Sequence, residues 1–84
     1  MAHQWQGVIP EYRERLPFAD TDPIVSLGEG GTPLVHARAL DARTGARVNV
    51  KVEGMNPTGS FKDRGMTTAI SKVLQSDTKV VACA

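Results

Sequence analysis

Cysteine is nearly absent from this 84-residue sequence, which contains only Cys83. A single cysteine cannot form an intrachain disulfide, so the chain is not a small secreted scaffold held together by disulfides. No apolar run approaches the roughly 20 residues needed to span a bilayer. The first seven residues lack the basic start and the apolar stretch of a secretory signal peptide. We therefore expect a cytoplasmic protein with no membrane partner.

Charge of one sign is not in excess either. Ten Lys and Arg residues are balanced by nine Asp and Glu residues, and the two kinds are interspersed along the chain. Because proteins that bind nucleic acid need clustered positive charge, we expect no nucleic-acid partner. The two histidines, His3 and His36, lack metal-ligand spacing, so we expect no metal site. A chain this short forms one small domain at most.

Turn-forming residues divide the first half of the chain. Residues 10–16 predict a short helix with proline in its first turn. Residues 24–27 predict a short strand or an extended segment. Three glycines followed by Thr-Pro, within residues 28–35, predict a turn that leads into an extended stretch. Residues 37–44 predict a helix, with Gly45 as its C-terminal stop.

The second half of the chain has clearer periodic patterns. Residues 47–53 alternate polar and apolar side chains, which predicts a strand. A loop follows at 54–59, and Ser60 with Asp63 fits a capping box at the start of a helix. Apolar residues then recur at helical spacing and predict one buried stripe, formed by Met66, Ala69, Ile70, Val73 and Leu74. Residues 79–84 are typical of a buried parallel strand.

This order predicts an α/β fold with a βαβ unit at about residues 47–84, which requires a parallel sheet. One helix cannot cover both faces of such a sheet, so we expect sequence beyond the chain to complete it. Residues 1–84 are then a partial N-terminal segment. Within it, residues 1–46 form an N-terminal extension with a Gly-Thr-Pro element. We expect Trp5 and Tyr12 to pack this extension against the rest.

The segment that carries chemistry is Asn56-Pro-Thr-Gly-Ser-Phe-Lys-Asp-Arg-Gly65. It places Lys62 in the first turn of a helix, where the helix dipole disfavours an ammonium group, and burial would disfavour it further. A neutral lysine is a nucleophile that can form a Schiff base with an aldehyde cofactor. The neighbouring Asp63 carboxylate would instead favour the charged ammonium form of Lys62. By spacing alone, a solvated lysine at a helix start is the commoner arrangement, so Lys62 is a candidate site.

Two glycine-rich motifs suggest other kinds of binding site, for a nucleotide or for an anion. Residues 54–59 have the glycine spacing of a P-loop, but Ser60 and Phe61 follow where a P-loop needs Lys and then Ser or Thr. The turn at residues 28–31 could present amides to an anion. A tight turn that needs positive φ is the simpler explanation of its glycines. Cys83 lies in an apolar run, where packing is a commoner role than reactivity.

Residues 56–66 are similar to the cofactor-lysine segment of threonine synthases, which belong to the tryptophan synthase β-subunit class (fold type II) of pyridoxal-phosphate enzymes. Residues 28–34 resemble the Glu-Gly-x-Thr-Pro-Leu element of that family. Residues 51–54 resemble the strand before the lysine loop, and residues 81–84 the strand before the Ser-Thr-Gly-Asn loop. Threonine dehydratases and cysteine synthases share parts of the lysine motif and stay open as alternatives. So do a non-catalytic truncated domain and an anion-binding module at the helix start.

The resemblance implies an enzyme that converts O-phospho-L-homoserine and water into L-threonine and phosphate. It implies that Lys62 holds pyridoxal 5'-phosphate as a Schiff base and, once freed, acts as the general base for the substrate α-proton. A homodimer is possible for the full-length form. The family elements that bind the cofactor phosphate have no counterpart in these residues. We therefore expect the 84-residue chain alone to be inactive.

Overall fold

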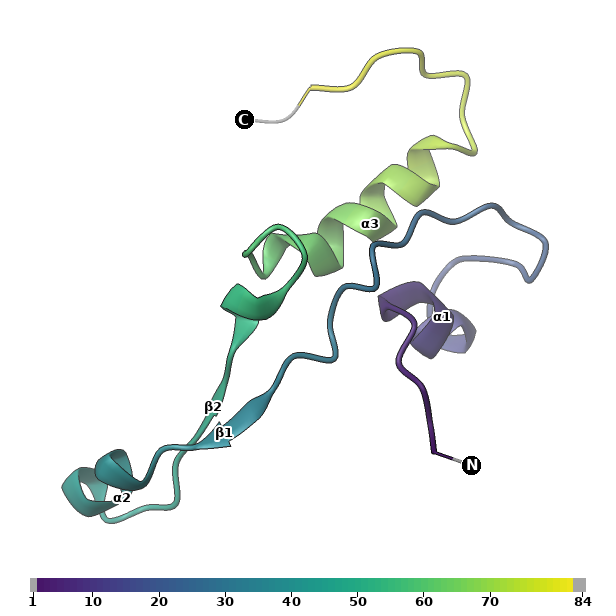
Figure 1. Cartoon of the computed structure of the whole chain (residues 1–84). Coiled ribbons are helices and arrows are strands. Elements are labelled where there is room, and N and C mark those ends of the chain that lie inside the picture. The colour runs from purple at the N-terminus through teal and green to yellow at the C-terminus, as the bar shows by residue number, and fades with distance from the viewer. Residues whose placement is uncertain (1, 83–84) are drawn as a thin grey trace.

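The computed structural model describes residues 2–82, which form an elongated body of 54 × 39 × 19 Å (Figure 1). Helices and strands are both present, but the regular elements are short. In chain order they are α1 (Val8–Tyr12), a 3-10 turn (Arg13–Arg15), β1 (Leu34–His36), α2 (Arg38–Thr44), β2 (Asn49–Lys51), a second 3-10 turn (Glu53–Met55) and α3 (Lys62–Val73). No helix within residues 2–82 is both long and apolar enough to cross a membrane.

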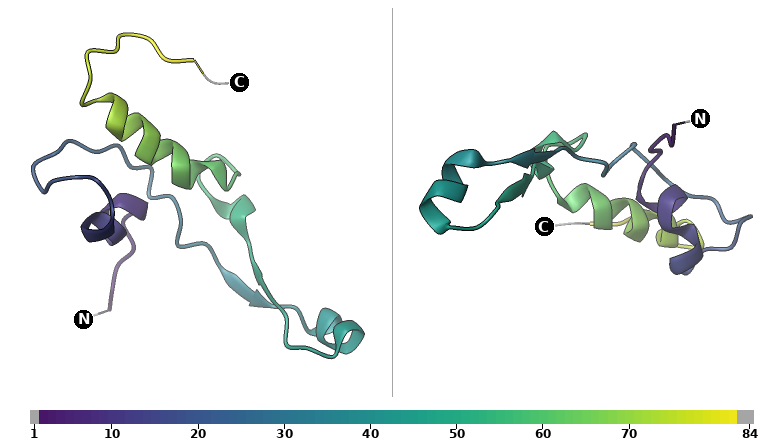
Figure 2. Two further views of the ribbon diagram at one scale, coloured as in Figure 1. Left: turned by 180° about the vertical axis from the view of Figure 1, so that it is seen from behind. Right: turned by 90° about the horizontal axis from the view of Figure 1, so that it is seen from below.

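The two strands form an antiparallel hairpin arm with α2 at its tip, extending away from α1 and α3 (Figure 2). Val35 pairs with Val50 in the middle of the ladder. The helix α2 ends at Gly45, whose φ of 73° is left-handed and whose amide donates to the Asp41 carbonyl. The Asp41 side chain accepts the Val48 amide at 2.6 Å, which ties the start of the second strand to the helix. The predicted helix with a glycine stop is thus confirmed.

The parallel βαβ unit predicted for residues 47–84 does not form among residues 2–82. The strand predicted at 47–53 contracts to β2, which pairs antiparallel with β1, and Val50 is exposed. Residues 79–82 contain no strand, and residues 83–84 lie outside the described residues. A strand needs a neighbour for its backbone groups. The described part of the chain gives residues 79–82 no such neighbour, and Val80 is 84% exposed.

The apolar core is small and lies in the N-terminal third. The helix predicted at 10–16 begins earlier, at Val8, and its second half is the 3-10 turn that ends at Arg15. Within residues 2–82, the buried hydrophobic side chains are Ile9 in α1 and Phe18 after it. The helix α1 contacts α3, and Ile9 in α1 is fully buried. So small an apolar core leaves much of the packing to polar contacts.

The buried face of α3 is polar, and the predicted buried stripe is wrong. Met66 and Leu74 are 40% and 50% exposed, whereas the buried residues of this helix are Asp63, Thr67 and Ser71. These three recur every four positions and so share one face. Ser71 shows the reason: its hydroxyl accepts the Val25 amide at 2.8 Å. The extended chain beside α3 has no strand partner here, so its backbone groups need polar side chains.

The predicted capping box is also wrong in detail. The helix α3 begins at Lys62, and the Ser60 hydroxyl accepts the Lys62 amide at 3.1 Å. The Asp63 carboxylate does not return to Ser60. It accepts the Thr58 amide at 2.8 Å and a second hydrogen bond from the Thr58 hydroxyl. The tight turn at residues 56–59 makes this longer reach possible, since the Gly59 amide donates to the Asn56 carbonyl there.

Candidate active site around Lys62

Lys62 is the first residue of α3, and its side chain is exposed. Among residues 2–82 its Nζ makes no hydrogen bond or ion pair, and it lies 5.1 Å from the centroid of the Phe61 ring. The side chain lines an open cavity of about 620 Å³ together with Glu53, Phe61, Arg64, Gly65, Met66 and Ala69. The described residues do not bury this side chain. What they supply is an accessible amine beside a largely apolar wall.

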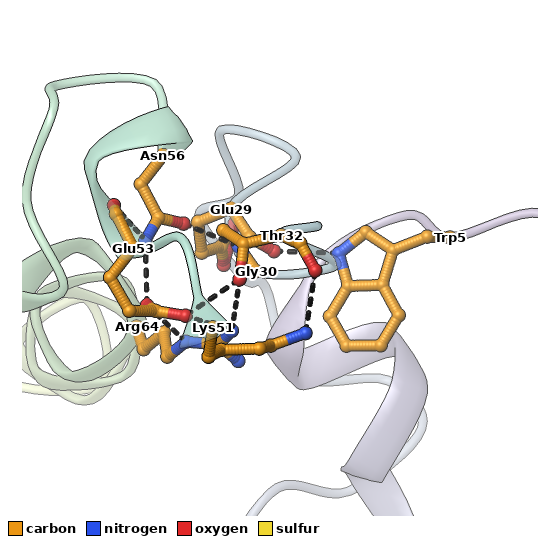
Figure 3. A network of polar contacts seen from close by, with 8 residues as sticks. All are labelled: Trp5, Glu29, Gly30, Thr32, Lys51, Glu53, Asn56 and Arg64. Atoms are coloured by element: carbon orange, nitrogen blue, oxygen red, sulfur yellow. Dashed lines mark hydrogen bonds and ion pairs between the residues drawn. The ribbon is translucent and has the colours of Figure 1, made fainter. Parts of the chain in front are cut away.

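A bidentate ion pair closes the loop that precedes Lys62 (Figure 3). The Arg64 guanidinium donates from Nε to Glu53 Oε2 and from Nη2 to Glu53 Oε1, both at 2.8 Å. Thr32 adds a hydroxyl hydrogen bond to Glu53 Oε1 at 2.7 Å. Asn56 adds an amide hydrogen bond to Glu53 Oε2 at 2.8 Å. We call Gly30, Thr32, Glu53, Asn56 and Arg64 the Glu53 network.

The charges of this network stabilise each other. The Arg64 guanidinium, helped by the Thr32 hydroxyl, lowers the pKa of Glu53 to about 2, although burial acts in the opposite direction. In return, the hydrogen bonds to Glu53 raise the pKa of Arg64. Hydrogen bonds to the charged form of a group favour that form. Each partner of this ion pair therefore favours the charged form of the other.

The Gly28–Gly31 turn is attached to this network. The Gly30 amide donates to Asn56 Oδ1 at 2.7 Å, and Gly30 has a φ of 80°. Trp5 lies against the turn, and its Nε1 donates to the Glu29 carbonyl at 2.7 Å. The Gly28 amide donates to the Ser26 hydroxyl. The Gly28 and Gly30 amides are therefore already hydrogen-bonded within the chain, and a tight turn with positive φ explains the glycines.

Glu29 is the fully buried carboxyl group of this turn. Burial would raise its pKa, but the Thr67 hydroxyl, the backbone amides of Glu29 and Leu27 and the Ser26 hydroxyl outweigh burial, so the pKa is lowered. Oε2 accepts hydrogen bonds from Ser26 and from the Leu27 amide, both at 3.1 Å. Among residues 2–82, Oε1 has no hydrogen bond of regular geometry. Glu29 thus joins the turn to the extended segment before it.

Three segments that the sequence singled out separately therefore meet in one place: residues 28–34, 51–54 and 56–65. Glu53 and Arg64 were not predicted as site residues from the sequence. Both lie within those segments, and their opposite charges were the available signal. The histidines lie apart: His3 contacts Glu11, and His36 contacts Asp41.

Two other expectations concern single residues. Trp5 and Tyr12 pack edge to face with ring centroids 6.1 Å apart, as expected for residues that hold the N-terminal segment. Cys83 lies outside the described residues. Within the part of the chain that the structure describes, no group of three or more His, Cys, Asp or Glu residues could hold a metal ion.

Comparison with known proteins decides the family. A family model described as "Pyridoxal-phosphate dependent enzyme" matches residues 25–84. The chain belongs to this family. Relatives that resemble the chain include threonine synthase of Mycobacterium tuberculosis, 54% identical over 98% of this chain, and threonine synthase of Synechocystis, 54% identical over 99%. Threonine synthase of Methanocaldococcus jannaschii is 50% identical over 87% of the chain. The chain spans only 18–23% of the length of these relatives.

The residues present fit the aldehyde end of pyridoxal phosphate. Attachment needs a primary amine that is accessible and not engaged by a carboxylate, and Lys62 meets this condition among residues 2–82. The cavity of about 620 Å³ beside it lies in the size range of small-molecule sites, roughly 300–1,000 Å³. Its apolar wall includes Phe61, Met66 and Ala69.

Proposed function

We propose that the protein to which this chain belongs is a threonine synthase. It converts O-phospho-L-homoserine and water into L-threonine and phosphate, and Lys62 holds pyridoxal 5'-phosphate covalently. The observation that carries this proposal is the accessible Lys62 amine at the start of α3, beside an apolar cavity, in a chain 54% identical to threonine synthases over nearly its whole length.

The residues of this chain have distinct roles in the proposed site. Lys62 attaches the cofactor, and when released it accepts the α-proton of the substrate. The bound cofactor supplies an electron sink for that carbanion chemistry. Phe61 and Met66 contribute apolar side chains to the wall of the cavity beside the amine. Proton transfer needs the amine in hydrogen-bond reach of the α-carbon proton, so the position of Lys62 matters as much as its identity.

The test is a combined activity and attachment assay on the full-length protein. The wild type is expected to release phosphate and form threonine from O-phospho-L-homoserine. After borohydride reduction and digestion, the pyridoxyl label is expected on Lys62. Lys62→Ala should abolish both. Lys72→Ala is the matched control, because Lys72 lies on the same helix and binds the Pro17 carbonyl and Gln75 instead.

The outcomes separate the candidate functions. Activity on threonine or serine without need for a γ-phosphate would replace the proposal by a dehydratase. Label on Lys62 without any lyase activity would favour a non-catalytic family member. Label elsewhere in the wild type would remove Lys62 from the site. The isolated 84-residue chain is expected to be inactive in the same assay.

We also propose that the whole protein has the fold type II arrangement. In it, residues 79–84 form a strand parallel to β2, and residues 47–84 make the βαβ unit, with residues 1–46 as an N-terminal extension. Within residues 2–82, one edge of β2 has no strand beside it and apolar residues of α3 are exposed, and both features support this arrangement. We propose a cytoplasmic homodimer. Backbone exchange protection at residues 79–84 and sedimentation of the full-length protein test the strand and the dimer.

A further inference from the structure

The loop that delivers Lys62 is held at both ends by side chains of the chain itself. Glu53 precedes the loop and Arg64 follows it, and between them the chain passes from β2 through a loop into α3 (Figure 1). The two parallel hydrogen bonds of this pair, each 2.8 Å long, fix both distance and orientation. A bidentate Arg–carboxylate contact adds geometric specificity that a single ion pair lacks.

The carboxylate of Glu53 is itself held in place from other segments. The Thr32 hydroxyl and the Asn56 amide reach its two oxygens, and both of these residues are 5% exposed. Asn56 also accepts the Gly30 amide at 2.7 Å. The ion pair is therefore anchored to the Gly28–Gly31 turn, as Figure 3 shows. A network whose members are all hydrogen-bonded rigidifies the structure around it.

The residues next to Lys62 determine where its side chain points. In an α-helix, successive side chains are turned by roughly 100° about the axis. Asp63 is buried and holds the Thr58 amide, and Arg64 holds Glu53. Lys62 lines the same cavity as Glu53 and Arg64, whereas Asp63 is buried against the loop.

We propose that Glu53 and Arg64 are positioning residues for Lys62: their ion pair sets the direction from which the amine meets the cofactor aldehyde. This inference rests on the proposed function, because it assumes that Lys62 is the attachment point. Neither residue is required to touch the cofactor. Their effect passes through the loop between them and through the first turn of α3.

The test compares variants of the full-length protein in two measurements. The first is the rate at which pyridoxal phosphate attaches to Lys62, followed by borohydride trapping and mass mapping. The second is amide hydrogen exchange of residues 54–61 in the cofactor-free protein. Glu53→Gln keeps the shape of the side chain but removes the ion pair. Arg64→Lys keeps the charge but cannot form two parallel hydrogen bonds.

Glu53→Gln is expected to slow attachment at Lys62 by about 10- to 100-fold, the usual effect of misplacing a reacting group by about 1 Å. Exchange of residues 54–61 should accelerate in parallel. Arg64→Lys should give a smaller loss of the same kind, and it carries the test if Glu53→Gln does not fold. The matched control is Asp41→Asn, which removes the carboxylate that binds His36 and the Val48 amide at the tip of the hairpin arm. It should change neither measurement.

The outcomes of the two proposals can be told apart. Wild-type label that falls away from Lys62 overturns the proposed function itself. Wild-type label on Lys62 with an unchanged rate in Glu53→Gln and in Arg64→Lys overturns the positioning role alone. A lower melting temperature with unchanged attachment also overturns it, because a merely structural pair would affect stability and leave the amine in place.

Discussion

Replacement of Gly30 by alanine tests how the N-terminal segment is joined to the site. Gly30 has a φ of 80°, and a residue with a Cβ atom costs roughly 1–2 kcal/mol more than glycine in that conformation. A Cβ atom would also lie 2.6 Å from Trp5 Cζ2 and 3.1 Å from Arg64 Nη1. Trp5 must therefore move and give up its hydrogen bond to the Glu29 carbonyl, worth about 0.5–1.5 kcal/mol.

The sum predicts a destabilisation of about 1.5–3.5 kcal/mol for Gly30→Ala. Gly28→Ala is the matched control, because Gly28 has a φ of 73° but no atom within 4 Å of its Cβ position. It should lose only the conformational part, about 1–2 kcal/mol. Since about 1.4 kcal/mol is a factor of ten, amide exchange of residues 25–33 should accelerate roughly 10- to 300-fold in the first variant and 5- to 30-fold in the second.

Equal acceleration in the two glycine variants would refute this reasoning, because the contact with Trp5 would then contribute nothing. A double mutant separates the partners. In a Trp5→Ala background, the difference between the two glycine variants should disappear. A difference that persists would mean that Arg64, rather than Trp5, meets the new methyl group.

Three further predictions concern single side chains. Ser71→Ala leaves the part-buried Val25 amide without its acceptor and should destabilise by about 1–3 kcal/mol in urea unfolding. Ile9→Ala empties a fully buried site and should destabilise by about 2–5 kcal/mol in the same assay. The folded-state pKa of Glu53, about 2, lies below its ordinary 4.5. The stability that this carboxylate contributes is thus complete above about pH 4.5 and lost toward pH 2. The difference in unfolding free energy between the wild type and Glu53→Gln should shrink over that range.

The elements that the sequence predicted well are those fixed by local chemistry. The helix expected at 37–44 is present as α2, because Gly45 supplies the left-handed residue that ends it. Lys62 lies in the first turn of a helix after a tight loop, as the Pro57-Thr58-Gly59 sequence indicated. In each case a few neighbouring residues favour the conformation that is observed.

Elements that depend on distant partners were predicted less well. The apolar pattern of α3 indicated a buried stripe, but Met66 and Leu74 are exposed and Thr67 and Ser71 are buried. An apolar pattern reports which face is buried only where a neighbour is present to cover it. Among residues 2–82 the short helix α1 contacts α3, and so does an extended segment whose backbone needs hydrogen bonds. The Glu53–Arg64 pair was missed for a similar reason, since no short-range rule joins residues eleven positions apart.

The wrong prediction for α3 and the unpredicted Glu53–Arg64 pair have one physical origin. With Ile9 and Phe18 as the buried hydrophobic side chains of residues 2–82, little apolar area fixes the shape of this part of the chain. The lysine loop is instead fixed by directional contacts, at Glu53 and at Asp63. Such contacts contribute modest net stability but strongly restrict geometry, because each buried polar group is expensive to leave without a partner. A site that must hold an amine in one direction gains more from that restriction than from additional hydrophobic burial, which is not directional.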